Sequence, residues 1–289
     1  MKLETYIVNA FTEEIACGNP AGVVLLYQDL PLDLMQKIAF DINKSETAFV
    51  RQTGHGEFSL RWFAPLTEVP LCGHATLGAS KVIFYKHPEL SEIKFSYKDG
   101  TIIVNQDEEE NIAMLFLLDE YKVIDIDPEF YEFFNLREIK TCIQGVNTRK
   151  VILILNEGVD LRNIKPDYRR MKESKGKSDY GIGITKLSKQ HDFESRYFNP
   201  WYGVDEDPVT GSVHTVLANY WGRQLGKKTM TAYQNSQRPG ELILSIKDGG
   251  KVEIKGKARI FIQGQIEVQV EIQIHQRHPH QHASVGEQR

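Results

Sequence analysis

The sequence is poor in the features that mark several large classes of protein. It has only three cysteines in 289 residues, Cys17, Cys72 and Cys142, and their wide spacing argues for reduced thiols over a disulfide framework. The formal net charge is −4, with lysine and arginine scattered among acidic residues, so there is no basic field to attract nucleic acid. No run of about eighteen apolar residues occurs, and the N-terminus lacks the apolar stretch of a secretory signal. We therefore expect a soluble, cytoplasmic protein with neither a nucleic-acid nor a membrane partner.

Cofactor motifs are missing as well. Neither glycine-rich loop that cradles nucleotide phosphates, G-x-G-x-x-G or G-x-x-x-x-G-K-[ST], is present. A metal site could be drawn from Cys72, His74, Asp207 and His214, but their spacings match no standard ligand signature. The sequence therefore predicts no metal and no organic cofactor.

What the chain does have is a long-range internal repeat. In each copy an Arg-aromatic-Phe-x-Pro segment runs through an acidic loop into glycine and small polar residues that open an apolar helix. The copies are Arg61-Trp62-Phe63-Ala64-Pro65 before Cys72-Gly73-His74-Ala75-Thr76-Leu77, and Arg196-Tyr197-Phe198-Asn199-Pro200 before Asp207-Pro208-Val209-Thr210-Gly211-Ser212-Val213. Such similarity is typical of two halves built on one plan. If the halves face each other, two helix N-termini meet in one cleft and would bind a small carboxylated molecule.

The two copies differ in their polar residues. Position for position, Gly211 matches Gly73, Ser212 matches His74, and Thr210 matches Cys72. A racemase that uses paired thiols needs cysteine in both copies, so we expect no two-thiol chemistry here.

Hydrophobic periodicity predicts an α+β chain with several strands and one strongly apolar helix in each half. The predicted helices are 32–43, 73–85 and 211–225. The predicted strands are 3–11, 22–27, 46–52, 57–64, 93–97, 101–106, 112–118, 140–145, 150–155, 180–187, 192–199, 241–246, 251–255 and 258–272. The segment 119–132 carries too many charges to be a core strand.

These elements divide the chain into three parts. We place an N-terminal half at 1–120 and a C-terminal half at 121–274, whose last strand could return to the N-terminal half. Residues 275–289, rich in histidine and glutamine, are expected to be a disordered tail without a part in the chemistry.

Glu46 lies at the entrance of a predicted strand, directly after a predicted helix. Burial away from a cation would raise its pKa toward neutrality, the range in which a general acid/base works best. The alternative is that Glu46 caps the preceding helix or pairs with Lys44 or Arg51, and spacing alone favours this structural role.

The two helix starts carry the other candidate residues. Gly73 lets the backbone approach a ligand closely, His74 could donate a hydrogen bond or shuttle a proton, and Cys72 could act as a thiolate. Both Cys72 and His74 could equally be buried packing or capping residues. At the second start, Pro208 biases Asp207 toward an extended conformation just before the helix. Asp207 or Thr210 could also serve only as the helix cap.

Four motifs taken together resemble the PhzF family of phenazine-biosynthesis-like isomerases. They are Phe11-Thr12 with Gly18-Asn19-Pro20-Ala21-Gly22-Val23-Val24, then Ser45-Glu46-Thr47-Ala48-Phe49, Leu71-Cys72-Gly73-His74-Ala75-Thr76, and Glu206-Asp207-Pro208-Val209-Thr210-Gly211-Ser212. In this order they span nearly the whole chain. The resemblance implies the diaminopimelate-epimerase-like fold, with two similar halves, each a curved, mostly antiparallel, barrel-like sheet around a central helix. It also implies an active site in the cleft and a homodimer.

The resemblance assigns roles to particular residues. In that family the glutamate at the position of Glu46 is the acid/base that moves a proton between carbons, without metal or organic cofactor. The residues at His74 and Asp207 orient the substrate and assist proton movement. Substrate-binding groups are implied at Asn19, Ser45, Cys72, Gly73, Ala75, Thr210, Gly211 and Ser212.

The expected function is therefore cofactor-independent isomerisation of a small carboxylated metabolite. Two alternatives stay open, because a fold and its motifs do not fix a reaction. One is an epimerase or racemase of amino or hydroxy acids. The other is a non-catalytic small-molecule-binding or partner protein on the same fold.

Overall fold

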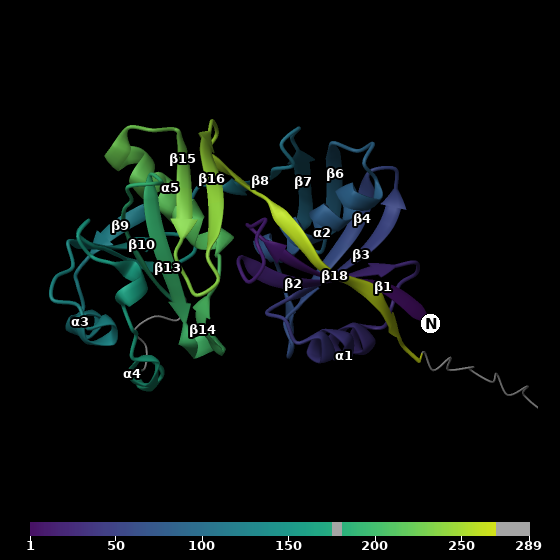
Figure 1. Cartoon of the computed structure of the whole chain (residues 1–289), viewed down its shortest axis with the longest axis horizontal. Coiled ribbons are helices and arrows are strands. Elements are labelled where there is room, and N and C mark those ends of the chain that lie inside the picture. The colour runs from purple at the N-terminus through teal and green to yellow at the C-terminus, as the bar shows by residue number, and fades with distance from the viewer. Residues whose placement is uncertain (175–180, 270–289) are drawn as a thin grey trace, which may run out of the picture.

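The computed structural model describes residues 1–174 and 181–269 of the chain. It is an α+β structure in which a large curved sheet encloses two long helices, as expected from the sequence (Figure 1). None of the helices in the described ranges combines the length and the apolar character needed to cross a membrane. The part of the predicted last strand beyond residue 269 and the predicted tail at 275–289 lie outside the described residues.

The first repeat unit comprises β1 to β8 and two helices. Its elements are β1 (Lys2–Ala10), β2 (Asn19–Leu26), α1 (Leu32–Ile42), β3 (Thr47–Gly54), β4 (Glu57–Phe63), β5 (Glu68–Val69), α2 (Gly73–Lys86), β6 (Glu92–Tyr97), β7 (Gly100–Gln106) and β8 (Ile112–Leu117).

The second repeat unit comprises β10 to β17, and β9 precedes it. The elements are β9 (Tyr121–Ile124), α3 (Pro128–Phe134), β10 (Thr141–Gly145), β11 (Val151–Ile154), the 3-10 turn η1 (Leu161–Asn163), α4 (Tyr168–Glu173), β12 (Ile182–Leu187), β13 (Phe193–Asn199), η2 (Pro200–Tyr202), β14 (Val204–Asp207), α5 (Gly211–Leu225), β15 (Thr229–Gln234), β16 (Gly240–Lys247) and β17 (Lys251–Gly256). The last described strand is β18 (Ala258–Glu267).

The two units share one topology. In the first, β2 pairs in parallel with β3 and β4 with β6, and in the second β11 pairs in parallel with β12 and β13 with β15. The remaining pairs in the described sheet are antiparallel. The units exchange their outermost strands. The strand β18, which follows the second unit, pairs with β1 of the first, and β9, which follows the first unit, pairs with β10 of the second. The strands β8 and β17 pair with each other across the two units. The internal repeat of the sequence is therefore a repeat of strand order as well.

Each unit wraps its sheet around one helix. The helix α2 contacts β1, β2, β3, β8 and β18, and α5 contacts β9, β15, β16 and β17. Both are buried over most of their length, and they also contact each other. Polar residues on these buried helices bond to the preceding turn: Thr76 Oγ1 donates to the Cys72 carbonyl at 2.6 Å, and His214 Nδ1 lies 2.7 Å from the Thr210 carbonyl. A buried helix can carry them because each has a partner.

Most predicted elements lie within a few residues of their place in the structure. The sequence analysis did not predict β5, β9, β14, β15, α3 and α4. The strand β9 lies in the charged segment 119–132, and none of its residues is fully buried, so it is not a core strand. For two of these elements, α3 and β15, the sequence contains features that predict them. Asp127 caps α3 by accepting from the Glu129 N–H, with proline in the first turn, and β15 alternates buried and exposed residues.

The repeated Arg-aromatic-Phe segment carries the same ion pair in both units, with different burial. Arg196 contacts Glu206 through Nε at 2.6 Å and Nη2 at 3.0 Å, and the two side chains are 7% and 8% exposed. Arg61 makes the matching contacts with Glu68 at 2.8 Å, but those side chains are 40% and 37% exposed. In the second unit the backbone of η1 and the residue after it closes over the pair, since Arg196 Nη1 donates to the carbonyls of Leu161 and Ile164 at 2.7 Å each.

We therefore expect Arg196→Met to lower the free energy of unfolding by about 3–5 kcal/mol, because it leaves the Glu206 carboxylate buried without its cation. The matched change Arg61→Met should cost at most about 1 kcal/mol, since water screens the exposed pair. Urea denaturation of both variants measures the difference. Equal losses in the two variants would contradict this account of the repeat.

Candidate functional site

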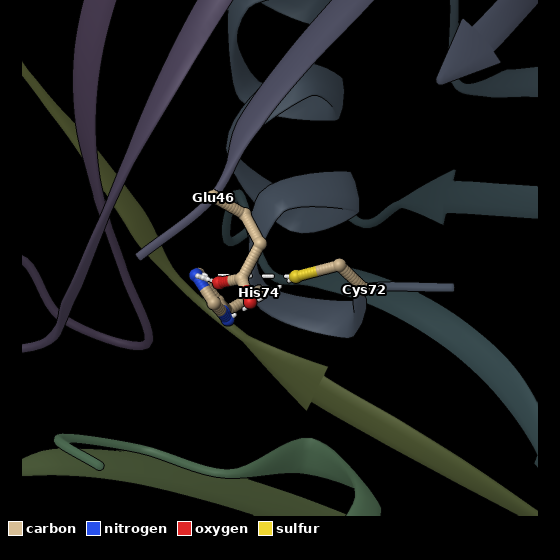
Figure 2. A group of neighbouring side chains, drawn as sticks. All are labelled: Glu46, Cys72 and His74. Carbon is tan, nitrogen blue, oxygen red and sulfur yellow. Dashed lines mark hydrogen bonds and ion pairs between the residues drawn. The ribbon is translucent and has the colours of Figure 1, made fainter. Parts of the chain in front are cut away.

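The start of α2 brings together a carboxylate, an imidazole and a thiol (Figure 2). Glu46 immediately precedes β3, Cys72 is the N-cap residue of α2, and His74 lies in its first turn. His74 Nε2 is 3.2 Å from Glu46 Oε2 and 3.2 Å from Ser45 Oγ, and His74 Nδ1 is 3.4 Å from Cys72 Sγ. Glu46 therefore pairs with His74 and not with Arg51, which contacts Asp29 at 2.8 Å.

The second unit contributes an acid at the start of α5. Asp207 ends β14, and both of its carboxylate oxygens accept hydrogen bonds, from Asn19 Nδ2 at 2.8 Å and from Thr210 Oγ1 at 2.5 Å. Asn19 is the first residue of β2 and fully buried, and it also donates to the Val209 carbonyl at 3.0 Å. These bonds join the two units, since Asn19 and Asp207 are far apart in sequence. The charges of Glu46 and His74 both act on the pKa of the Asp207 carboxyl, so the acid of the second unit lies within electrostatic range of the first cluster.

The helix starts are left open toward a ligand. Cys72 and Thr210 are the N-cap residues of α2 and α5, and neither makes a side-chain capping bond. Thr210 therefore does not cap α5 through its side chain, and the Asp207 carboxylate accepts from Asn19 and Thr210 side chains. A Cβ added at Gly211 would have no atom within 4 Å, and Ser212 is exposed. Gly73 is partly exposed, whereas Ala75 is fully buried in the core. The first-turn N–H groups of α2 and α5 thus keep the capacity to bind an anion.

Charges within the first cluster hold Glu46 ionised. Burial alone would raise the pKa of Glu46, but the contacts with His74, Ser45 and Cys72 outweigh it, and the pKa lies below its ordinary value. Burial would likewise lower the pKa of His74, yet its contacts with Cys72 and Glu46 raise the pKa well above the ordinary range. Burial and the nearby Glu46 charge raise the pKa of Cys72, although His74 and the backbone N–H of Ala75 act against this. The expectation of a raised Glu46 pKa is therefore wrong, because a histidine lies beside the carboxylate.

The pKa of Asp207, the acid of the second unit, is shifted in the opposite direction, above its ordinary value. Burial raises the pKa of Asp207, although His74 and the bonds from Thr210 and Asn19 act against it. Burial lowers the pKa of Lys150 to about 8, although the charge of Asp207 acts against this. Its Nζ donates to Tyr197 OH at 2.7 Å, and Tyr197 is the strand partner of Asp207.

Two polar residues of this region were missing from the sequence analysis. Lys150 directly precedes the buried strand β11, a position at which a lone lysine gives little signal. Gln234, at the end of β15, donates to the Asp207 carbonyl at 2.7 Å and accepts from the Thr210 N–H at 2.9 Å. It is fully buried, and only the parallel pairing of β15 with β13 brings it to the site.

The four-residue metal set considered from sequence does not come together. In the described ranges the group of possible ligands is Glu46, Cys72 and His74. His214 faces away from it, with Nδ1 at the Thr210 carbonyl and Nε2 3.5 Å from Ser195 Oγ.

The strand pairings show which residues of the two units occupy equivalent positions. At the positions of Glu46 and Asp207 the other unit has a residue without a carboxylate. Phe63 pairs with Thr47 and its repeat counterpart Phe198 pairs with Ile182, so Glu46 and Gly181 occupy equivalent positions before these partners. A Cβ at Gly181, whose φ is +81°, would lie 2.3 Å from Tyr197 OH, which leaves no room for a second glutamate. By the same comparison, Trp62 pairs with Val69 and Tyr197 pairs with Asp207, so Asp207 has an apolar counterpart. Each acid is therefore unique to its unit.

Comparison with known proteins gives a consistent result. The model of the phenazine biosynthesis-like protein family matches residues 8–264. A phenazine biosynthesis-like domain-containing protein of Bos taurus is 37% identical over 92% of this chain and 99% of its own length. A Pseudomonas aeruginosa protein named as an uncharacterized isomerase is 35% identical over 93% of this chain and all of its own. The crystal structure of a PhzF-family protein of Enterococcus faecalis aligns with a TM-score of 0.85 at 35% identity, over 93% of this chain and all of that one.

The fold is also found in proteins with little sequence identity to this chain. A hydroxyproline epimerase of Agrobacterium vitis aligns over 92% of both chains with a TM-score of 0.56 at 9% identity. This comparison shows a shared fold and nothing more.

The pKa values of the two buried histidines near the helix starts should be shifted in opposite directions from the ordinary value. His74 should keep its proton at pH 7 because its pKa is raised, whereas His214 should be neutral there because burial lowers its pKa to about 4. Glu46→Gln removes the negative charge beside His74, so the pKa of His74 should fall while that of His214 stays unchanged. Imidazole NMR titration of the wild type and the variant measures both. A neutral His74 at pH 7 in the wild type would contradict the ion pair.

Proposed function

Because the chain belongs to the phenazine biosynthesis-like (PhzF) family, we propose that it is a cofactor-independent isomerase that moves a proton between carbons of a small carboxylated metabolite. The observation that carries the proposal is the state of Glu46. Its side chain is 22% exposed, its Oε2 lies 3.2 Å from His74 Nε2, and the contacts with His74 help to hold its pKa below the ordinary value, so the carboxylate is ionised. Such a carboxylate is in the form that can accept a proton, and a substrate that displaced the His74 contact would raise its pKa toward the range in which a general base works best.

The open helix starts supply the substrate-binding part of the proposal. The substrate carboxylate binds the N–H groups at the starts of α2 and α5, near Gly73 and Gly211. These groups and protonated His74 stabilise the negative charge that develops when a neighbouring C–H bond breaks.

Proton transfer then follows from the positions of the acids. Glu46 takes the proton from one carbon while the bond electrons shift into the adjacent π system, and the protonated Glu46 returns it to another carbon. The ion pair with His74 favours the ionised Glu46 that the first step needs. Asp207, held by Asn19 and Thr210, orients the substrate from the other side. The substrate itself is left open in this proposal.

The alternative of an epimerase has less support from the geometry. Epimerisation by two bases needs an acid/base on each face of one carbon. At the position equivalent to Glu46 the second unit has Gly181, closely packed against Tyr197, and at the position equivalent to Cys72 it has Thr210. Asp207 lies in the second unit, but its two carboxylate oxygens accept hydrogen bonds from Asn19 and Thr210. Glu46 is therefore the carboxylate that we assign to proton transfer, which fits isomerisation better.

A binding protein without catalysis is the second alternative. It would bind carboxylates at the helix starts but would need no ionised acid/base there. A panel of small carboxylic acids separates the two, since bound ligands raise the melting temperature in either case. Only the isomerase also exchanges ligand C–H hydrogen for deuterium from solvent.

We expect Glu46→Gln to abolish this exchange, with a loss of at least about a hundredfold as is typical of removing a general base. Carboxylate binding and the fold should persist, since glutamine has nearly the same shape. Proton NMR of the acids in deuterated water measures the exchange, and thermal shift measures binding.

The chain offers a matched control in Glu89. This glutamate also lies near a histidine, 3.4 Å from His87, but its side chain is 57% exposed and remote from both helix starts in sequence. Glu89→Gln should leave exchange unchanged. Full exchange in Glu46→Gln would overturn the assignment of Glu46, and label at an inverted carbon with no double-bond movement would favour the epimerase.

A further inference from the structure

Three different metal-binding groups lie within reach of one another at the start of α2 (Figure 2). One ligand atom each from Glu46, Cys72 and His74 lies within 4.8 Å of the other two, and among the described residues this is the one such group. A thiolate, an imidazole nitrogen and a carboxylate oxygen are the ligands that zinc takes in proteins. The sequence suggested Cys72 and His74 as possible ligands but not Glu46, because Glu46 precedes β3 whereas Cys72 and His74 lie at the start of α2.

The spacing of the atoms suits a tetrahedral ion. Bonds of about 2.3 Å to sulfur and about 2.0–2.1 Å to nitrogen or oxygen place neighbouring ligand atoms roughly 3.3–3.6 Å apart. His74 Nε2 lies 3.2 Å from Glu46 Oε2 and 4.0 Å from Cys72 Sγ. Small movements of the side chains would bring all three atoms to bonding distance of one ion.

A second observation points to a cationic ligand at the same place. Glu46 Oε2 is buried, and its contact is the ion pair with His74 Nε2 at 3.2 Å, so an ion that displaces the imidazole proton would take the place of that positive charge beside the carboxylate. A carboxylate of the other unit, Asp207, is close enough to act on the same groups. The Glu46 side chain is 22% exposed, which offers an ion a route from solvent to the otherwise buried Cys72 and His74.

We propose that Glu46, Cys72 and His74 bind a soft divalent cation such as Zn²⁺, and that the ion inhibits the enzyme. On binding, Cys72 and His74 release their protons to solvent and donate lone pairs to the ion, so charge and atoms balance. The inhibition rests on the proposed function, because the ion occupies the Glu46 oxygen that takes the substrate proton. Binding of the ion does not depend on that function. The ion is an inhibitor in this proposal and no part of catalysis.

The test uses Cd²⁺ as a probe for Zn²⁺, because a thiolate bound to Cd²⁺ gives an ultraviolet charge-transfer band. Histidines alone give no such band, so ions held by the histidine-rich C-terminal tail do not contribute. The double variant Cys17→Ser/Cys142→Ser leaves Cys72 as the only thiol of the chain. The variant Cys72→Ser keeps the other two thiols and removes the one in the cluster.

We expect one Cd²⁺ per chain to give a saturable band in the wild type and the double variant, and none in Cys72→Ser. Zn²⁺ should displace the band, while Mg²⁺, which prefers oxygen ligands, should not. His74→Gln, which keeps the thiol, should weaken Cd²⁺ binding by more than about tenfold. A band that survives in Cys72→Ser, or one that is missing from the double variant, would overturn the cation site.

Inhibition is measured separately by deuterium exchange. Saturating Zn²⁺ should stop exchange in the wild type, and a chelator should restore it. Exchange that continues at Zn²⁺ concentrations that abolish the Cd²⁺ band would overturn the inhibitory role. If no exchange is found even without metal, the proposed function fails, and the Cd²⁺ band still decides the binding site.

Discussion

The burial of the start of α2 is the constraint on which the site depends. A lone carboxylate or imidazolium would lose much of its hydration there, and each becomes tolerable because the other lies 3.2 Å away. The neighbouring polar groups are satisfied in the same way. Trp62 Nε1 donates to Thr76 Oγ1 at 3.1 Å, and Thr76 in turn donates to the Cys72 carbonyl. The polar cluster is thus continuous with the packing of the core, which fixes the position of Glu46 relative to the helix.

The fold could be predicted from the sequence to a large extent, because its signals are local. The helix α5 begins and ends where expected, at Gly211 and Leu225, because the residues before it cannot continue a helix and Gly226 adopts the left-handed conformation at its end. The repeat and the four motifs indicated two similar units, and the matching strand order agrees with that. Residues without local signals, such as those of the two-residue strand β5, were missed.

The sequence predicted which residues lie in the candidate site better than it predicted their contacts and pKa values. Glu46, His74 and Asp207 lie within electrostatic reach of one another as the motifs suggested, yet their roles as catalytic residues stay predictions. Spacing in the sequence could not show which charged side chains form ion pairs with one another. Arg51 seemed available to Glu46 from its place in the chain, but the strand geometry directs it to Asp29. Because pKa values depend on such long-range contacts, the direction of the Glu46 shift was predicted wrongly.

The repeat provides a common frame, and each unit adds one acid to it. Glu46 has a glycine as its counterpart and Asp207 a valine, so neither acid belongs to the part that the two units share. The shared part is the pair of open helix starts. In the proposed function, anion binding thus belongs to the duplicated frame, while the placement of acids distinguishes one side from the other.

The exchange of outer strands has a consequence for biosynthesis. The strand β1 has β2 on one side and β18 on the other, with Ala10 opposite Ala258, so the first unit lacks its outer strand until nearly the whole described chain has been made. Ribosomes that add about 5–20 residues per second need roughly 12 to 50 seconds to synthesise the residues between Ala10 and Ala258. During this time β1 presents an unpaired edge, the kind of surface at which nascent chains pair wrongly. The first unit is thus the first to be synthesised and among the last to be completed.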